Sequence, residues 1–353
     1  MTVYRAAIVG LTGIAAAPLA PSAHPALGEA VPHSHAGAYS LEPRATVVGV
    51  CDLKPELLER FQADWGATFP EARGYTDYRA LLAEQRPDLI SVVTSDHRHA
   101  RIVLDAIAAG VKGVFCEKPI ATTLADADRM IAAGRAAGVP LVINHSRRWY
   151  PELHEARRLI RGGAIGPLRR IVATLGGPRA MLFRNGTHLL DTVCFFAESE
   201  PRWAMGELDD EHAAHPPRYA GDGGRDPATD PGGSAYVHFE NGRRAFVSAS
   251  KGTVANFELD LVGERGRIRL GTHVAELVRP DEEGRLAALP LHRPRTARSD
   301  AVAAVAHLID RVEGVGEELS TGEDGRRVLS ILLAVLQSSA AGGQPVRFPV
   351  RDA

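Results

Sequence analysis

Strand-like apolar runs alternate with helical segments over residues 1–145. The runs are short and bounded by glycine, proline or polar residues, a pattern typical of buried strands. Such alternation requires crossover connections, which are right-handed and produce a parallel sheet. We therefore predict an α/β fold with a doubly wound parallel sheet. The predicted strands are Val3–Val9, Thr46–Cys51, Arg73–Tyr75, Leu89–Val93, Gly113–Cys116 and Val139–Ile143, and the predicted helices are Glu56–Trp65, Tyr78–Glu84, Ala100–Ala109 and Leu124–Ala137.

The length of 353 residues exceeds what one hydrophobic core usually supports. Two domains are expected, with the boundary at residues 145 and 146. The formal net charge is only -2, and basic and acidic residues are interspersed. This charge pattern does not indicate a nucleic-acid or membrane partner.

The cysteines and the N-terminus together indicate a cytoplasmic protein. Cys51, Cys116 and Cys194 are far apart and lack the spacing of a zinc cluster or a disulfide scaffold. The apolar stretch at residues 6–20 imitates a signal peptide, but glycines and prolines interrupt it and only Arg5 precedes it. No uninterrupted apolar run reaches the roughly 18 residues of a membrane span.

A glycine-containing turn follows the first predicted strand. Gly10, Thr12, Gly13 and Ile14 lie between this strand and small residues that can begin a helix. Backbone N–H groups in such a turn can hold a dinucleotide pyrophosphate, although Thr12 occupies the place of the second glycine in the usual fingerprint. An ordinary strand–helix turn is the alternative.

Asp52 ends the second predicted strand. An acidic side chain there can accept both ribose hydroxyls of an adenosine and repels a 2′-phosphate, which favours NAD over NADP. Lys54 keeps NADP possible. Alternatively, Asp52 caps the helix that Pro55 can begin.

The distance from the glycine turn to Asp52 is about twice the usual 20 residues. The surplus is assigned to an insertion at residues 18–32, at the end of the first helix. His24, His33 and His35 lie in or beside it, but no carboxylate or cysteine partner is near in the sequence. We therefore expect a surface loop and no metal site.

Polar residues follow two further strands, where the ends of parallel strands line a ligand crevice. Thr94 and Ser95 follow one strand, and Glu117 and Lys118 follow the next. His99, a few residues after Ser95, either contributes to the cofactor site or only caps the following helix. Lys118 is a candidate catalytic residue, and a surface pair with Glu117 is the alternative.

Several of these motifs occur together in one known family. The turn at Gly10, Asp52, the run 94–99, the Glu-Lys-Pro step at 117–119, and residues 144–151 followed by 163–166 resemble the Gfo/Idh/MocA family of glucose–fructose oxidoreductase and inositol dehydrogenase. The resemblance implies an N-terminal Rossmann domain and a C-terminal α+β domain with an open, mainly antiparallel sheet. One face of that sheet often forms a dimer interface, so a homodimer or homotetramer is expected.

The second half of the sequence agrees with this expectation. Asn241-Gly242 is a strong hairpin signal, and residues 209–233 are rich in proline, glycine, aspartate and histidine, which predicts a long loop. The predicted strands are 168–175, 235–240, 244–250, 257–262 and 267–270, and two helices are predicted at 300–313 and 322–341.

The resemblance places a catalytic histidine at His188. Asp191 lies three residues later, so the two side chains share one face of a helical turn. His188 would move a proton to or from a substrate hydroxyl, and Lys118 would polarise the same oxygen. A capping or core histidine is the alternative.

One departure from the family pattern concerns the residue four positions before His188. Family members that act on sugars or inositol commonly have aspartate there, whereas this chain has Arg184, followed by Asn185. Either Asp191 or a water molecule replaces that aspartate as the partner of His188, or Arg184 binds an anionic substrate, with Arg147, Arg148 and Arg179 adding positive charge. Alternatively, these arginines lie on helix surfaces or interfaces. The expected substrate-binding set is Arg148, Trp149, Arg184 and Asn185.

The sequence therefore predicts an NAD(P)-dependent oxidoreductase acting on a secondary alcohol or ketone of a sugar, inositol or related polyol. One alternative is a redox-neutral enzyme that retains NAD during epimerisation or glycoside cleavage. Another is a nucleotide-binding sensor without catalysis.

Overall fold

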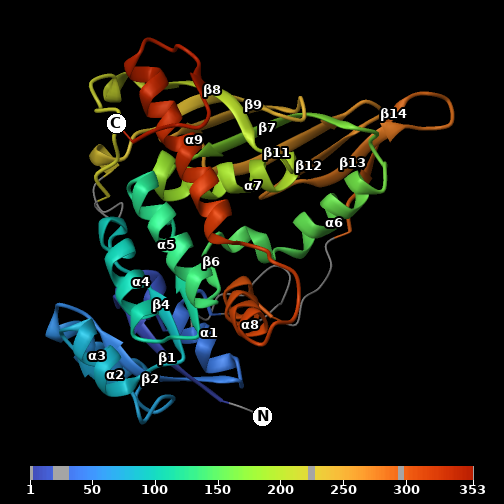
Figure 1. Cartoon of the computed structure of the whole chain (residues 1–353). Helices are drawn as coiled ribbons and strands as arrows, with labels where there is room; N and C mark the ends of the chain where they lie inside the picture. The colour runs from blue at the N-terminus through green and yellow to red at the C-terminus, as the bar shows by residue number, and fades with distance from the viewer. Residues whose placement is uncertain (1–2, 19–31, 222–226, 293–297, 353) are drawn as a thin grey trace. The chain divides into compact units, whose positions relative to one another are not determined.

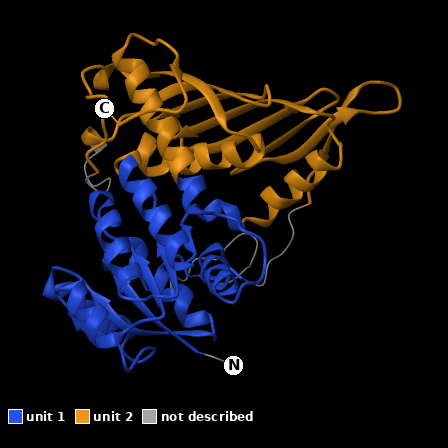
Figure 2. Ribbon diagram, in the orientation of Figure 1, with its two compact units in different colours: residues 1–121, 125–149, 295–325 blue, residues 122–124, 150–294, 326–353 orange. Residues whose placement is uncertain are grey.

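The computed structural model describes residues 3–18, 32–221, 227–292 and 298–352 (Figure 1). Contacts divide the chain into two compact units, coloured separately in Figure 2. Unit 1 comprises Met1–Ala121, Ala125–Trp149 and Arg295–Gly325, and unit 2 comprises Thr122–Leu124, Tyr150–Pro294 and Arg326–Ala353. The first unit therefore extends slightly beyond residue 145 and includes a later segment that the sequence analysis assigned to the second domain.

Unit 1 contains a six-stranded sheet in the order β3-β2-β1-β4-β5-β6, and all its strand pairs are parallel. This order defines a Rossmann sheet. Its central strands are buried along nearly their whole length, which explains their continuous apolar sequences. The predicted doubly wound sheet is confirmed. The strands are β1 (Tyr4–Val9), β2 (Ala45–Cys51), β3 (Arg73–Tyr75), β4 (Leu89–Val92), β5 (Gly113–Cys116) and β6 (Leu141–Ile143).

The helices that follow these strands lie close to their expected positions. Pro55 stands at the first position of α2, and Asp77 caps α3 by accepting a hydrogen bond from the Arg79 backbone. The described helices that follow the second to fifth strands are α2 (Pro55–Trp65), α3 (Tyr78–Gln85), α4 (His99–Ala108) and α5 (Leu124–Ala137).

The first helix is interrupted after a single turn. Gly13–Ala15 forms a 3-10 turn, and the Ala17 N–H donates to the Gly13 carbonyl. Helix α1 proper begins only at His35 and runs to Leu41, with Ser34 as its N-cap. The Ser34 hydroxyl donates to the Ala17 carbonyl at 2.7 Å, so the two pieces are adjacent.

This arrangement corrects two expectations about the insertion. The extra residues interrupt the helix rather than follow it, and His35 is a buried helical residue rather than part of a surface loop. His33 is exposed, and His24 lies outside the described residues.

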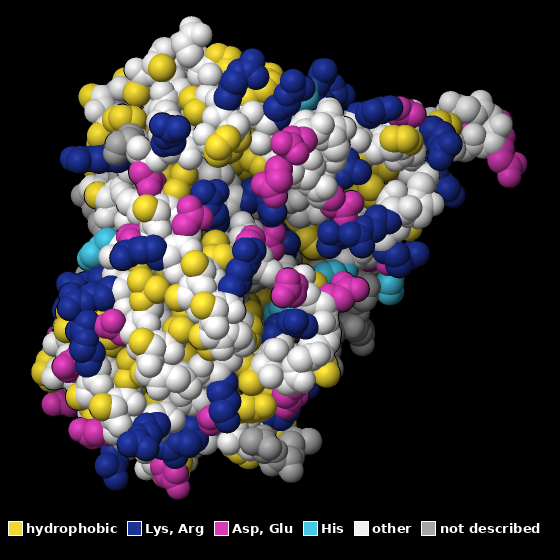
Figure 3. Space-filling model, viewed as in Figure 1, with side chains coloured by type: hydrophobic (Ala, Val, Ile, Leu, Met, Phe, Trp, Pro, Cys, Tyr) yellow, Lys and Arg dark blue, Asp and Glu magenta, His cyan; other side chains and the backbone are white. Residues whose placement is uncertain are grey.

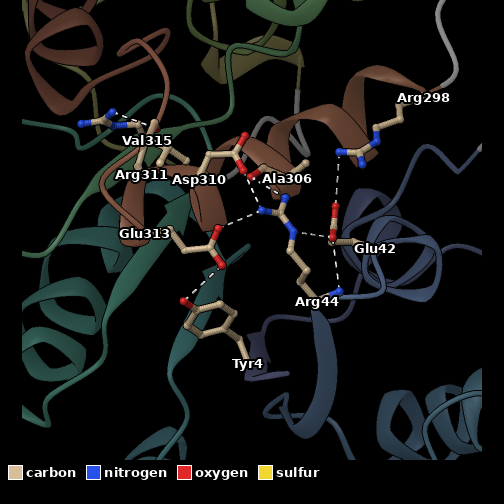
Figure 4. Close-up of polar contacts among 9 residues, drawn as sticks. All are labelled: Tyr4, Glu42, Arg44, Arg298, Ala306, Asp310, Arg311, Glu313 and Val315. Atoms are coloured by element: carbon tan, nitrogen blue, oxygen red, sulfur yellow. Dashed lines mark hydrogen bonds and ion pairs between the residues drawn. The ribbon is translucent and has the colours of Figure 1, made fainter. Parts of the chain in front are cut away.

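Helix α8 (Asp300–Val312) packs against α1 and β5, which explains why residues 295–325 belong to unit 1. Arg44, at the start of β2, connects these segments (Figure 4). Its guanidinium donates to the buried Glu42 carboxylate at 2.9 Å and to Asp310 of α8 at 2.7 Å. A hydrogen bond with Glu42 is the largest cause that raises the pKa of Arg44. This ion-pair cluster fixes a helix distant in sequence onto the Rossmann unit.

Unit 2 contains a nine-stranded sheet in the order β14-β13-β12-β11-β7-β10-β9-β8-β15. Only the β7–β10 pair is parallel, so the expected mainly antiparallel sheet is confirmed. The strands are β7 (Leu168–Gly176), β8 (Pro201–Leu208), β9 (Gly233–Phe239), β10 (Arg244–Ser250), β11 (Asn256–Gly263), β12 (Arg267–Gly271), β13 (Ala275–Pro280), β14 (Leu286–Pro290) and β15 (Val346–Arg347).

Helix α7 (Thr187–Ala197) contacts β7 and β10 in this unit. Helix α6 (Pro151–Arg161) precedes the sheet, and the chain passes from unit 1 to unit 2 within α9 (Gly322–Ala340). Among the described residues, none of the helices combines the length and apolar character that a membrane crossing needs. Basic and acidic side chains alternate over the visible face rather than forming one large patch of either sign (Figure 3).

Candidate active site

The carboxyl ends of five strands meet along one edge of the Rossmann sheet. Val9 aligns with Cys51 and Val92, Val92 with Cys116, and Cys116 with Ile143. Because the strands are parallel, the residues immediately beyond them come from distant parts of the sequence to one edge. These residues include Gly10, Asp52, Thr94, Glu117 and Asn144.

Gly10 begins the predicted cofactor turn and can only be glycine. Its φ angle is +90°, and a Cβ added there would lie 2.4 Å from the Val93 carbonyl oxygen. The backbone therefore approaches the neighbouring strand end as closely as a glycine permits. Thr12, Gly13 and Ile14 follow on the surface, and the Ile14 side chain is 50% exposed.

Asp52 is half-buried and accepts two backbone hydrogen bonds. Leu11 N–H donates to its Oδ2 at 2.9 Å, and Lys54 N–H donates to its Oδ1 at 3.1 Å. Asp52 thus ties the glycine turn to the start of α2. A carboxylate offers about four acceptor sites, so lone pairs remain for ribose hydroxyls. The glycine turn and Asp52 fit the adenosine half of a dinucleotide, although the turn continues as one short helical turn.

Thr94 and Ser95 are half-exposed just beyond β4, whereas His99 is fully buried. The His99 Nδ1 lies 2.9 Å from the Pro119 carbonyl oxygen, and its Nε2 lies 3.1 Å from that of Thr94. Two carbonyl acceptors favour an imidazole that carries protons on both nitrogens. His99 therefore links the loop after β4 to the loop after β5.

Glu117 is buried at the centre of a hydrogen-bond cluster. Its Oε1 accepts from Asn144 Nδ2 at 2.6 Å and lies 3.1 Å from His35 Nε2. Burial alone would raise the pKa of this carboxyl, but the hydrogen bond and charge of His35, the charge of Lys118 and the hydrogen bond with Asn144 lower it to about 2. Glu117 is therefore an anion at neutral pH.

Lys118 follows Glu117 and is half-buried. Its backbone N–H donates to Glu117 Oε2 at 3.3 Å. The alternative is a surface lysine paired with Glu117. It does not fit, because the Glu117 carboxylate is buried and bonded to His35 and Asn144. Lys118 belongs to unit 1.

Arg148 and Trp149 also belong to unit 1 and have structural contacts. Arg148 is buried, donates to the Leu319 carbonyl at 3.0 Å and lies 3.4 Å from Asp324. Trp149 is buried and packs edge-on against Phe115. These contacts position both residues within unit 1, and their assignment to substrate binding stays a prediction.

His188 and Asp191 lie in unit 2 on α7, every residue of which is buried. Thr192 Oγ1 donates to the His188 carbonyl at 2.8 Å, one turn earlier in the helix. Their three-residue spacing falls on one helical turn, as the sequence indicates. The helix thus presents the two side chains from the same face.

Arg184 and Asn185 are half-buried in a π-helical turn, Leu182–Gly186, immediately before α7. The fully buried Asp230 holds this turn because its two oxygens accept from the backbone N–H groups of Phe183 and Arg184, at 3.0 and 2.9 Å. Asp230 comes from the long segment between β8 and β9, so that segment positions the turn.

Arg179 provides a second cation near this turn. Desolvation is the main cause that lowers the pKa of its guanidinium, and the charge of Arg184 lowers it further. Arg179 and Arg184 are therefore close enough for their charges to repel.

Sequence reasoning missed three residues with site-related contacts: His35, Asn144 and Asp230. The first two bind Glu117, and the third binds the turn before α7. In the described part of the chain, no group of three or more histidine, cysteine or acidic side chains is arranged to hold a metal ion.

A parallel sheet in the order 3-2-1-4-5-6, with glycine and aspartate at its strand ends, defines a dinucleotide-binding protein. Residues 4–145 match the family described as "Oxidoreductase family, NAD-binding Rossmann fold", and residues 153–269 match the "GFO/IDH/MocA C-terminal domain". The chain belongs to the Gfo/Idh/MocA family and is an NAD(P)-dependent oxidoreductase.

Individual relatives agree with this assignment. D-apiose dehydrogenase of Paraburkholderia graminis is 38% identical over 122 residues, which cover 35% of this chain and 31% of that protein. D-apiose dehydrogenase of Rhizobium rhizogenes is 25% identical over 325 residues, covering 84% of this chain and 89% of that protein. A solved oxidoreductase from Agrobacterium radiobacter, in complex with NAD+, L-tartaric acid and magnesium, shares the fold, with a TM-score of 0.76, 20% identity and 98% coverage of both chains.

Proposed function

We propose that this protein transfers hydride between a nicotinamide cofactor and a secondary alcohol or ketone of a sugar, inositol or related polyol. Membership of the family supports the reaction class, and the D-apiose dehydrogenases support a sugar-like substrate. The observation that carries the assignment is the strand edge with Gly10, Asp52 and the Glu117–Lys118 step.

Lys118 and His188 are assigned the proton chemistry. The Lys118 ammonium donates a hydrogen bond to the reacting substrate oxygen and favours its alkoxide character as the C–H bond weakens. His188 takes the hydroxyl proton during oxidation and returns it during reduction, with Asp191 on the same helical face. The nicotinamide ring, when bound, supplies or accepts the hydride.

NAD is the proposed cofactor, with NADP possible. The Asp52 carboxylate would accept the adenosine ribose hydroxyls and repel a 2′-phosphate. Gly10, Thr12, Gly13 and Ile14 would surround the pyrophosphate. Thr94 and Ser95 would line the cofactor site just beyond β4. His99 would hold the loops after β4 and β5 through its bonds to their carbonyl groups, and Glu117 would act through its bond with Asn144.

The proposed substrate carries a carboxylate or another anionic group. Arg184 occupies the position where the family resemblance implies aspartate, and its charge acts on Arg179 in the same region. Asp230 accepts a hydrogen bond from the Arg184 backbone N–H, so the Arg184 side chain extends from a backbone that is held in place. Guanidinium groups bind carboxylates with bidentate geometry, so this region favours an acidic polyol, such as an aldonate or a uronate.

We also propose a cytoplasmic homo-oligomer that uses the outer face of the unit 2 sheet. Aromatic side chains follow one another across β8, β9 and β10, where Trp203 lies 5.1 Å from Tyr236 and Tyr236 lies 5.0 Å from Phe246 between ring centroids. Phe246 is 42% exposed and Met205 36% exposed beside a hollow on this face. A second copy of the sheet would cover these apolar side chains.

The function is tested first by calorimetric titration with NAD+, NADH, NADP+ and NADPH. A screen of polyols, sugars, aldonates and uronates by nicotinamide absorbance follows. We expect binding with preference for NAD(H) and turnover of at least one hydroxy compound. Nucleotide binding without turnover of any of these classes would contradict the proposed substrate class, and no binding would contradict the cofactor assignment.

A further inference from the structure

A chain of buried polar groups ends at Glu117 in unit 1. Tyr39 Oη lies 3.1 Å from Ser91 Oγ, and Ser91 Oγ lies 3.0 Å from His35 Nδ1. The opposite ring nitrogen of His35 lies 3.1 Å from Glu117 Oε1. All four residues are buried, and Ser91 is 0% exposed.

The chemistry of the carboxylate fixes the direction of the contact with His35. The Glu117 carboxylate only accepts, so His35 Nε2 carries a proton and donates to it. The other ring nitrogen, Nδ1, faces the Ser91 hydroxyl, which in turn faces the Tyr39 hydroxyl. Burial raises the pKa of the Tyr39 phenol to about 12, despite a smaller opposing contribution from the Ser91 hydrogen bond, so Tyr39 is neutral. His35 is therefore a donor to Glu117 that buried polar groups hold from its other side.

This set of serine, histidine and glutamate is not a nucleophilic triad, because Ser91 has no access to a substrate. The accessible residue beside it is Lys118, whose backbone N–H donates to the second oxygen of Glu117. Asn144, beyond β6, donates to the same carboxylate oxygen as His35. Glu117 is thus held by side chains from α1 and from the end of β6, while it contacts the next residue in the chain.

We propose that His35 and Asn144 are positioning residues that hold the Glu117 carboxylate so that Lys118 stands in its working orientation. This inference rests on the proposed catalytic role of Lys118. It assigns a function to the histidine that follows the insertion. The Ser34–Ala17 hydrogen bond returns the chain to the first helical turn immediately before His35. The interrupted helix thereby still delivers the imidazole to Glu117.

Two amide substitutions of His35 distinguish a role in positioning Glu117 from a role in packing alone. In His35→Gln the side-chain nitrogen takes the place of Nε2 and keeps the donor to Glu117. In His35→Asn the shorter amide reaches only the Ser91 side. We expect His35→Asn to lower kcat about tenfold or more, while His35→Gln stays within about threefold of the wild type. The Kd for NAD and the KM for substrate should change by less than about twofold in both.

The control is Ser40→Ala on the same helix, because the Ser40 hydroxyl donates to the Gly37 carbonyl within that helix rather than to Glu117. It should leave kcat unchanged. Thermal unfolding of each variant reports whether it is folded. If His35→Asn does not fold, Asn144→Ala replaces it, since this change removes a Glu117 donor without altering α1.

Equal kcat values in His35→Gln and His35→Asn would overturn the inference, whether both are high or both are low. In the Asn144 experiment, unchanged kcat would do the same. Lys118→Ala distinguishes this failure from failure of the proposed function. If Lys118→Ala is inactive while His35→Asn is fully active, only the positioning role fails. If Lys118→Ala is active, the catalytic assignment fails.

Discussion

The candidate regions of the two units are held in place in different ways. In unit 1, Glu117 beside Lys118 is bonded by side chains from a helix and from the end of a neighbouring strand. In unit 2, the turn that carries Arg184 is attached through its backbone to one carboxylate, Asp230, from a long irregular segment. The first arrangement joins side chains from different elements to one carboxylate, whereas the second joins one carboxylate to two consecutive backbone N–H groups.

This difference suggests that the two regions have different functions, one in turnover and one in substrate choice. A carboxylate bonded by several side chains and by the Lys118 backbone N–H would hold the proposed catalytic lysine in place, which suits chemistry common to all substrates. Asp230 bonds the turn through backbone N–H groups, which every residue except proline provides, so these two bonds allow the side chains there to differ. Changes in unit 1 should therefore affect turnover of every substrate, and changes around Arg184 should affect the choice of substrate.

The largest effect is expected from Lys118→Ala. Loss of the ammonium that stabilises the developing alkoxide should lower kcat about a thousandfold for every substrate, with little change in the Kd for NAD. Steady-state kinetics and calorimetry measure the two quantities. Lys112→Ala is the matched control, because that lysine is exposed and pairs with Asp88. Substantial turnover by the Lys118 variant would remove this residue from the mechanism.

Glu117→Gln should reveal a pH-dependent contribution to the stability of unit 1. The folded-state pKa of Glu117 is lowered from 4.5 to about 2, so its stabilising contribution is complete above about pH 4.5 and is lost as pH falls toward 2. This shift corresponds to on the order of 3 kcal/mol. The difference in unfolding free energy between wild type and variant should therefore narrow over this pH range in denaturant titrations. A difference that stays constant from pH 6 to about pH 3 would contradict the anionic, bonded state of Glu117.

A smaller effect is expected when the attachment of the unit 2 turn is weakened. Asp230→Asn keeps one acceptor but turns an amide donor toward a buried backbone N–H. We expect a loss of about 2 kcal/mol in unfolding free energy. The exposed Asp210→Asn serves as the control in thermal and denaturant unfolding. If both variants are equally stable, Asp230 does not hold the turn.

Asp52→Ala should have the most selective effect on the cofactor. Removal of its carboxylate should weaken NAD binding about tenfold and reduce discrimination against NADP. Calorimetric titration with both nucleotides measures this change. The carboxylate also accepts from Leu11 N–H, so a thermal unfolding curve should accompany the titration. Unchanged affinities for both nucleotides would remove Asp52 from the cofactor site.

The sequence predicts unit 1 well because its strands are buried on both faces and read as continuous apolar runs. Residues at strand ends could therefore be placed on one edge from topology alone. In unit 2 the sequence analysis did not predict β8, β13 and β14. Their side chains are largely exposed or alternate in burial, and β14 has no buried residue. Their pairing with neighbouring strands, rather than their own composition, makes them strands.

The missed site contacts share a physical cause, which is their distance in sequence. His35 meets Glu117 across 82 residues, and Asp230 meets the turn before α7 across 46 and 47 residues. No local periodicity encodes such pairs. The helical position of His35 was also hard to predict because a proline-rich insertion precedes it, so the start of α1 resembles part of a loop in the sequence. Asp230 was assigned to a long loop for its composition, although its side chain is entirely buried.

The central proposal is that Arg184 selects an anionic substrate for this enzyme. It is tested most directly by comparing kcat/KM for an aldonate and for the neutral polyol of the same configuration. Wild type and Arg184→Met are measured side by side, with the exposed Arg218→Met as control. We predict that the wild type prefers the acid at least about tenfold and that the Arg184 variant loses this preference while it keeps turnover of the neutral polyol. A wild type that prefers the neutral polyol, or an acid preference that survives in the variant, would contradict the account.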